Sequence, residues 1–434
     1  MPAERPPAAT AAGQRFGAFV AERSRAGELV LQPRMGFGAP AEMRRGLAAV
    51  RAAGPRTVGT ITVDSFTRVG AHEQAAIALA GGTELNGYPL VTHPPEVTER
   101  VLAGIAGADF PVQVRHGSAL PSALVAAALE CGLTATEGGP VSYCLPYSRV
   151  PLAEAVADWA RACAMLARHP DAHLESFGGC MLGQLCPPSL LVALDVLECL
   201  FFRQHGLRSV SLSYAQQTDS GQDAEALAAL RTLAGEFLGD LDWHVVLYTY
   251  MGVFPRTRHG AAALLRESVR LAVATGTERL VLKTRAEAFR IPSVEDNVAA
   301  LKDAHAAAAR FQDASPGAAF RNGDVHRSTV YREARTLIET VLALSDDLGA
   351  ALLEGFRRGF LDVPYCLHHD NKNRARTYLG KDGRLCWASV GAMPLEATPE
   401  SAPGHDPAPG SVELLRMLNW VRERFDRLER SDCP

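Results

Sequence analysis

The sequence predicts an α/β protein, a (β/α)8 barrel of the TIM type with a C-terminal α+β elaboration. Short β-type segments alternate with long Ala/Leu-rich helical segments from about residue 28 onward. Strands that alternate with helices form βαβ units, whose strands run parallel. Eight successive units are the number that a closed barrel requires.

The expected strands are short β-type runs, and the segments between them are Ala/Leu-rich with a helical pattern. One helical segment opens with Pro187 and Pro188, which suits a first helical turn, where the amides have no partner inside the helix. The strands are expected at 28–34, 56–64, 111–116, 132–137, 172–177, 209–214, 243–250 and 279–284, and the helices at 39–53, 94–107, 120–131, 152–168, 187–205, 222–238 and 258–275.

Segments outside the strand–helix repeat extend the barrel at both ends. The first residues lack the continuous apolar run of a signal peptide, and residues 396–410 are too rich in Pro, Ala and Gly to bury a core. A helix near 293–312 ends the barrel, and one long helix is expected near 328–359. The expected organisation is a partly disordered lead-in at 1–27, the barrel at 28–312, the elaboration at 313–395, a linker at 396–410 and a terminal helix at 411–434.

Composition excludes several classes of function. With 47% hydrophobic residues and a net charge of −4, the 434-residue chain is neither globally disordered nor basic enough to bind nucleic acid through its overall charge. The longest apolar stretch, near 189–202, contains Asp195 and Glu198 and is too short for a bilayer. Nine cysteines without a paired framework suit reduced thiols, so we expect a cytoplasmic protein.

Polar residues follow several of the expected strands. Chemistry in these barrels occurs where strands end, and the first four strands bring Arg34, Arg68, Arg115 and Glu137 to that face. Three guanidinium forks could bind the two carboxylates of a dicarboxylic acid. Alternatively, each arginine pairs with a local acid, such as Asp64 for Arg68.

Two further segments carry possible chemistry. In residues 136–147, Glu137 could act as a general base and Tyr143 and Tyr147 as hydrogen-bond donors, or the segment could be a structural turn. Lys283, after the eighth strand, could form a Schiff base, hold a phosphate or ribose, or simply pair with Glu287.

The one cluster of metal-ligand residue types is a weak candidate. His368, His369 and Asp370 are adjacent in an expected loop, where histidines are more often solvated than ligating. We expect no metal site there.

Taken in order, the segments at the strand ends resemble the glutamate mutase epsilon (E) subunit of the methylaspartate mutase family. Each segment is a weak signal by itself, but the ordered set spans most of the chain. The matching segments are QPRMG (32–36), DSFTR (64–68), LNGYP (85–89), QVRHG (113–117), EGGPVSYCLPY (137–147), ESFG (175–178), PPS (187–189), MGVFP (251–255), KTRAEAFRIP (283–292) and DVPY (362–365).

The resemblance implies an isomerase that interconverts L-glutamate and (2S,3S)-3-methylaspartate by a radical mechanism with adenosylcobalamin as cofactor. It implies that an arginine trio binds both substrate carboxylates and that a glutamate, the catalytic residue, attends the amino group. The implied substrate residues are Arg34, Arg68, Arg115, His116, Glu137, Tyr143 and Tyr147. The implied cofactor residues are Gly36, Asn86, Pro146, Phe254, Lys283, Glu287 and Ile291.

The resemblance also implies a partner subunit. The Asp-x-His-x-x-Gly signature that supplies the lower cobalt ligand is absent: the Asp-x-His pairs at His173, His244 and His326 lack the glycine. A small sigma-type subunit should therefore bind cobalamin, with this chain as a homodimer inside a heterotetramer, and no nucleic acid or membrane is expected as a partner.

Some positions depart from the family pattern. Pro140 replaces a third glycine, Arg285-Ala286 replaces Pro-His, and Tyr248-Thr249-Tyr250 stands where the family has His-Gln-Trp. These departures leave open a second hypothesis, a diverged barrel that only binds an amino-dicarboxylate or regulates. A third hypothesis is a Schiff-base aldolase that uses Lys283, the lysine at the end of the eighth strand.

Overall fold

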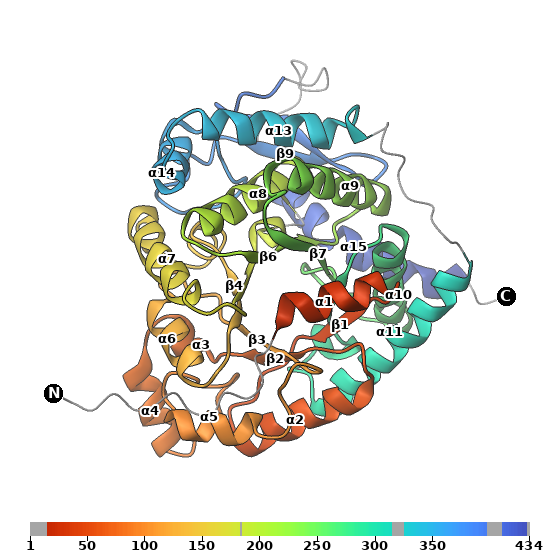
Figure 1. Ribbon diagram of the computed structural model, residues 1–434. Coiled ribbons are helices and arrows are strands. Elements are labelled where there is room, and N and C mark those ends of the chain that lie inside the picture. Colours follow the sequence, from red (N-terminus) through yellow and green to blue (C-terminus); the bar gives the residue numbers. More distant parts are fainter. Residues whose placement is uncertain (1–14, 183–184, 315–324, 397–409, 432–434) are drawn as a thin grey trace.

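Eight parallel strands curve into a barrel that is surrounded by helices (Figure 1). The computed structural model describes residues 15–182, 185–314, 325–396 and 410–431. Neighbouring strands follow the order β1-β8-β7-β6-β5-β4-β3-β2, and a bridge between Leu31 and Thr57 joins β1 to β2. The predicted barrel is confirmed. Its strands are β1 (Val30–Pro33), β2 (Gly59–Thr62), β3 (Val112–Arg115), β4 (Ala135–Gly138), β5 (His173–Ser176), β6 (Ser209–Ala215), β7 (Asp242–Tyr248) and β8 (Arg279–Leu282).

The helices between the strands also lie close to their predicted positions. They are α2 (Pro40–Ala53), α5 (Pro95–Leu102), α6 (Ser122–Glu130), α7 (Leu152–Leu166), α8 (Pro188–Gln204), α9 (Ser220–Phe237), α10 (Arg258–Ala274) and α11 (Val294–Ala314). The loops that follow β2, β5 and β8 contain short helices that the sequence analysis did not anticipate. These are α3 (Ser65–Arg68), α4 (His72–Ala80), η1 (Gly178–Cys180) and η2 (Arg285–Ala288).

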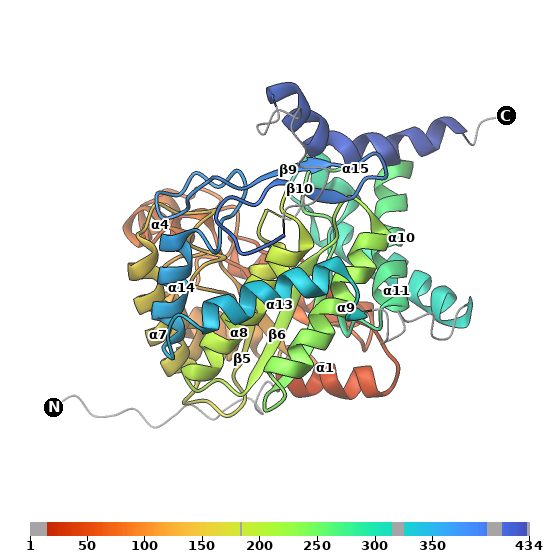
Figure 2. The ribbon, with the colours of Figure 1, turned by 90° about the horizontal axis from the view of Figure 1, so that it is seen from above.

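A helix that the sequence analysis did not anticipate, α1 (Phe16–Arg25), closes the N-terminal end of the barrel (Figure 1). Phe16 is fully buried, stacks on His173 at the start of β5 with ring centroids 5.2 Å apart, and lies 5.0 Å from the guanidinium of Arg279 at the start of β8. Figure 2 shows α1 at one end of the barrel, and the hairpin at 376–389 and the helix at 411–431 at the other. The mouth formed by the strand ends is therefore on the side away from α1.

Two helices form an outer layer over α8 (Figures 1 and 2). They are α13 (Thr329–Leu342) and α14 (Leu348–Arg358), so the prediction of one long helix over 328–359 was wrong. The break occurs because Asp347 caps a new helix, accepting a hydrogen bond from the amide of Ala350 at 2.6 Å. The outer layer explains why α8 is buried continuously from Pro188 to Phe202.

The remaining C-terminal elements are an antiparallel hairpin, β9 (Arg376–Leu379) and β10 (Leu385–Ser389), and the helix α15 (Ser411–Ser431), which packs on α10. Residues 1–14 of the expected lead-in and nearly all of the expected linker, 396–410, lie outside the described residues. Among the described helices, none combines the length and apolar character that crossing a bilayer requires.

Candidate active site

The arginines that follow the first three strands meet in one pocket at the mouth. Arg34 follows β1, Arg68 ends α3, and Arg115 ends β3. The pocket encloses about 440 Å³, including the space open to solvent, and all seven residues predicted to contact substrate line it. Its lining residues are Arg34, Thr62, Arg68, Arg115, His116, Gly117, Glu137, Tyr143, Tyr147, Phe177 and Met251.

Arg115 and Glu137 form a buried ion pair at the base of this pocket. Arg115 Nε donates to Glu137 Oε2 at 2.6 Å, and their side chains are 5% and 1% exposed. The buried Nη1 of Arg115 has no partner among the described residues. Because a buried donor is costly to leave unpaired, this nitrogen is suited to an anionic ligand.

His116 adds a second donor of the same kind. Burial, together with the charge of Arg68, lowers the pKa of His116 to about 3, so the ring is neutral at physiological pH. Its Nδ1 accepts from the amide of Ser118 at 3.0 Å, which places the ring hydrogen on Nε2. That Nε2 is buried and unpartnered within the described part of the chain.

Arg68 is held by the backbone and makes no use of the acid that precedes it. Its Nε donates to the carbonyl of His116 at 3.1 Å. Asp64 instead caps α3, accepting from the amides of Phe66 at 2.8 Å and Thr67 at 3.1 Å. The exposed Arg68 guanidinium therefore keeps its charge directed to the mouth.

The loop that carries Glu137 is built on close contacts. Gly138 has φ +128°, and a Cβ there would lie 2.4 Å from the Tyr143 ring, so this position requires glycine. Below the loop, the buried Glu198 of α8 accepts from the amides of Val141 (3.0 Å) and Ser142 (2.8 Å) and from the Ser176 hydroxyl at 2.7 Å. Burial raises the pKa of Glu198 to about 7. In the sequence, Glu198 is apparent only as an interruption of an apolar stretch.

The two tyrosines of this loop have different positions. Tyr143 is buried and its hydroxyl donates to Glu137 Oε1. Tyr147 is 46% exposed at the rim, with its ring edge-on to Tyr143 at 6.1 Å. The structural-turn interpretation therefore explains how the loop packs, while both phenols still reach the pocket.

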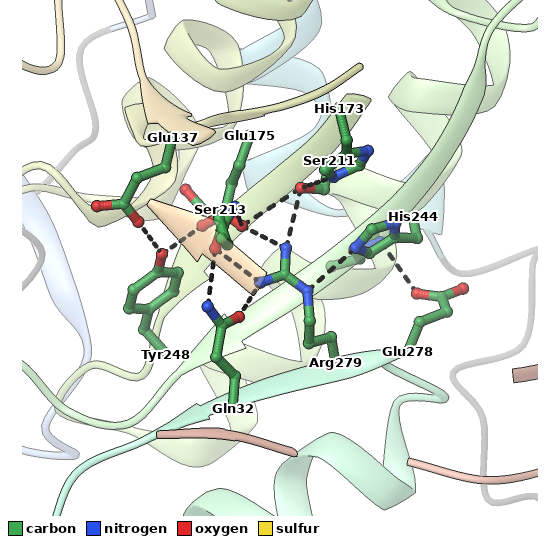
Figure 3. A network of polar contacts seen from close by, with 12 residues as sticks. Gln32, Glu137, His173, Glu175, Ser211, Ser213, His244, Tyr248, Glu278 and Arg279 are labelled. Carbon is green, nitrogen blue, oxygen red and sulfur yellow. Dashed lines mark hydrogen bonds and ion pairs between the residues drawn. The ribbon is translucent and has the colours of Figure 1, made fainter. Parts of the chain in front are cut away.

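Behind the pocket, polar side chains fill the barrel interior (Figure 3). Arg279 of β8 forms a fully buried ion pair with Glu175 of β5 and also donates to Ser211 at 3.1 Å and to His244 Nε2 at 3.2 Å. Tyr248, at the end of β7, donates to Glu137 Oε2 at 2.7 Å and contacts Glu175. Sequence reasoning assigned these residues no role, because only the barrel register shows that they face inward.

The seven predicted cofactor residues lie in three groups along the rim. Gly36, Asn86 and Ile291 line one hollow of about 780 Å³, and Pro146 lines another of about 1070 Å³ that shares Arg68 and Tyr147 with the arginine pocket. In the third group, the Lys283 ammonium lies 3.4 Å from Glu287 and 5.4 Å from the centre of the Phe254 ring.

Lys283 therefore does pair with Glu287, as one of the alternatives proposed. Burial holds the pKa of Lys283 below its usual value, and the charge of Glu287 only partly offsets this shift. The residues that line the arginine pocket do not include Lys283, which separates the lysine from the place where a dicarboxylate would bind.

Exposed apolar side chains lie on the loops after β2, β3, β7 and β8, on the same end of the barrel as the pocket. Phe289 is 70% exposed and Ile291 63%. Val69, Leu120 and Val253 are the other members of this apolar rim. Apolar side chains gathered around a pocket are typical of a surface that another molecule covers.

The cluster at 368–370 joins its loop to the segment before α7 by hydrogen bonds. His368 Nδ1 accepts from the amide of Asp370 at 3.2 Å and its Nε2 contacts the carbonyl of Val150 at 2.9 Å, while Asp370 accepts from the amide of Leu152 at 2.8 Å. Both ring nitrogens of His368 are engaged, so His368 offers no lone pair to a metal.

Two histidines of the Asp-x-His pairs, His173 and His244, lie in barrel strands and make contacts inside the barrel. His173 bonds through both nitrogens to Ser209 (2.9 Å) and Ser211 (3.0 Å), and its ring stacks on His244 at 5.0 Å. Both are buried near the N-terminal end of the barrel, on the side away from the mouth.

Fold and pocket together define a class: a (β/α)8 barrel with a buried, cationic pocket at the C-terminal ends of its strands, an arrangement typical of barrel enzymes that act on small anions. The model of the family described as methylaspartate mutase E chain (MutE) matches residues 11–402. The chain belongs to this family.

Its relatives carry a consistent name. The glutamate mutase epsilon subunit of Halobacterium salinarum is 31% identical over 87% of this chain and 81% of its own length. The subunit of the same name from Yersinia enterocolitica is 28% identical over 77% of this chain and 72% of its own length. That from Desulfitobacterium hafniense is 27% identical over 88% of this chain and 81% of its own.

Proposed function

We propose that this chain is the catalytic subunit of an adenosylcobalamin-dependent mutase that interconverts L-glutamate and (2S,3S)-3-methylaspartate by a radical mechanism. The observation that carries the proposal is the pair of buried donors, Arg115 Nη1 and His116 Nε2, in a pocket that Arg34 and Arg68 also line. Three arginines against one glutamate give this pocket the charge that a dicarboxylate requires.

The chain's own residues bind and orient the substrate. Arginine forks hold each carboxylate in a defined orientation, and Glu137 receives the amino group. Radical fragments held by their carboxylates recombine in place, because binding replaces diffusion. The buried aromatic rings of Tyr143 and Phe177 help to exclude water.

The rim fits a large cofactor shared with a second chain. A Cβ at Gly36 would be 2.3 Å from the Thr62 carbonyl oxygen, so this position requires glycine, and Gly36 lines a hollow together with Asn86 and Ile291. Lys283, Glu287, Phe254 and Pro146 would hold the cofactor elsewhere on the rim. When bound, adenosylcobalamin supplies the organic radical that starts the rearrangement.

A separate cobalamin-binding subunit accounts for the missing cobalt ligand. The barrel histidines His173 and His244 are committed to internal contacts, which supports a lower ligand from the partner. We further propose that the apolar rim with Phe289 and Ile291 docks that sigma-type subunit, within a heterotetramer that contains two copies of this chain.

The test is a reconstituted assay. The chain is mixed with adenosylcobalamin, L-glutamate labelled with ¹³C and a sigma-type subunit that carries Asp-x-His-x-x-Gly, and the products are followed by NMR. The proposal predicts 3-methylaspartate only when all components are present. Binding of L-glutamate without product would favour the non-catalytic binding barrel, and borohydride trapping of substrate on Lys283 would favour the aldolase.

A further inference from the structure

The hydroxyl of Tyr248 contacts two buried carboxylates at once. It lies 2.7 Å from Glu137 Oε2 and also contacts Glu175 Oε1. Tyr248 is 2% exposed and lies just beneath the residues that line the pocket. Because a phenol has a single hydrogen, the hydroxyl donates to one of the two carboxylates at a time.

On the inner side, Glu175 is a fixed support. Its other oxygen, Oε2, is paired with Arg279 and accepts from Gln113 Nε2 at 3.2 Å (Figure 3 shows the Arg279 network). Arg279 is held in turn by Ser211 and His244. All of these residues are buried in the barrel interior, so Tyr248 is attached to a rigid part of the molecule.

On the pocket side, Tyr248 helps to fill the acceptor positions of Glu137. Oε2 accepts from Arg115 and Tyr248, whereas Oε1 accepts from Tyr143. A carboxylate offers about four acceptor positions, so one position remains, on Oε1. While Tyr248 donates to Glu137 and not to Glu175, the three donors leave a single, defined place at which an ammonium group can bind Glu137.

We infer that Tyr248 is a positioning residue that fixes Glu137 for the substrate amino group and so favours amino-dicarboxylates over dicarboxylates that lack the amino group. The inference rests on the proposed function and deepens it. Tyr248 belongs to the segment 248–250, which departs from the pattern expected of the family.

Tyr248→Phe isolates the hydroxyl. Phenylalanine keeps the ring that lies 5.0 Å from the Arg115 guanidinium and the edge contact with Phe177 at 5.6 Å. A matched control is Tyr214→Phe, which removes a buried hydroxyl bonded to Asp223 at 2.9 Å on the neighbouring strand β6. Folding of both variants is checked by thermal melting.

Calorimetry on the purified chain compares L-glutamate with glutarate, which has the same two carboxylates and no amino group. Tyr248→Phe should weaken L-glutamate binding by about 5–10-fold, about the effect of losing one ordinary hydrogen bond, because the hydroxyl acts on the substrate only through Glu137; glutarate binding should change by less than about 2-fold. Tyr214→Phe should alter neither. Equal losses for both ligands, or no loss for L-glutamate, would overturn the inference. Failure of the wild-type chain to bind either ligand would contradict the proposed function itself, and the inference about Tyr248 would fail with the proposed function.

Discussion

The mouth of the barrel has two sides that are built differently. On the side of the arginine pocket, which we call the closed side, the base is buried and already paired: Arg115 and Glu137 are bonded to each other, and Glu198 holds the loop that follows Glu137. Arg68 and Tyr147, at the edge of this pocket, are exposed. On the side that we propose for the cofactor, which we call the open side, the residues lie in separate groups, and Phe289 and Ile291 are largely exposed, while Lys283 and Phe254 are buried. The difference suggests a substrate pocket that is formed in advance and a rim that a second molecule completes.

The largest effect should come from breaking the closed side. Arg115→Met leaves Glu137 buried without its partner, and we expect the free energy of unfolding to fall by about 3–5 kcal/mol and dicarboxylate binding to be lost. Arg68→Met, at an exposed position, should weaken binding but change stability by less than about 0.5 kcal/mol. Chemical denaturation and calorimetry on both variants check this. Equal destabilisation would mean that the pocket is not formed in advance as described.

Glu198 gives the closed side a pH dependence. Its pKa is raised from 4.5 to about 7 in the folded chain, so between these values the folded state holds the proton that the unfolded state has released. Stability should therefore decrease as pH rises from about 4.5 to 7, by an amount on the order of 1–3 kcal/mol. In Glu198→Gln, the free energy of unfolding, measured by denaturation at several pH values, should depend less on pH across this range. If the free energy of unfolding of the variant changes with pH as steeply as that of the wild type, Glu198 is not the source of this pH dependence.

On the open side, a charge on the rim should disrupt docking of the partner subunit without affecting dicarboxylate binding. Ile291→Asp introduces a carboxylate into a surface that we expect the partner to cover. We predict about 10-fold weaker assembly with the cobalamin-binding subunit and no change in glutarate affinity. Analytical ultracentrifugation measures the first and calorimetry the second. A loss of glutarate binding would show that the two sides are not separate.

The smallest effect is expected from α15, which supports the open side from behind. Asp426 accepts from the amide of Thr257 at 2.9 Å at the start of α10, and Phe425 packs in the same cluster as Phe254. Asp426→Ala should cost about 1 kcal/mol of stability, as the loss of a hydrogen bond to a backbone amide does. It should also weaken cofactor retention slightly while L-glutamate binding is unchanged. Thermal melts and spectroscopic titration with adenosylcobalamin and the partner test this.

The fold could be predicted from the sequence because its signals are local. Every barrel strand was found from short β-type runs that alternate with helical segments, and the intervening helices from their spacing. Helix α1 was not anticipated, since the burial of Phe16 depends on contacts with His173 and Arg279, far away in the chain. The division of the predicted 328–359 helix depended on the cap at Asp347, which the apolar spacing concealed.

The site was predictable in part for the same reason. Residues at the strand ends, such as Arg115 and Glu137, follow directly from the barrel topology. Glu175, Tyr248 and Glu198 were assigned no role, because their importance depends on the inward register of β5 and β7 and on the packing of α8 beneath a loop. Such relations join distant positions and leave no periodic signal in the sequence.

The central claim is that the pocket of Arg34, Arg68 and Arg115 recognises two carboxylates before any cofactor or partner is bound. Calorimetry of the purified chain with glutarate and with butyrate, which has the same carbon skeleton less one carboxylate, tests it most directly. The account predicts that glutarate binds at least about 100-fold more tightly, as expected for loss of a bidentate charged pair. Equal affinities for glutarate and butyrate would contradict it.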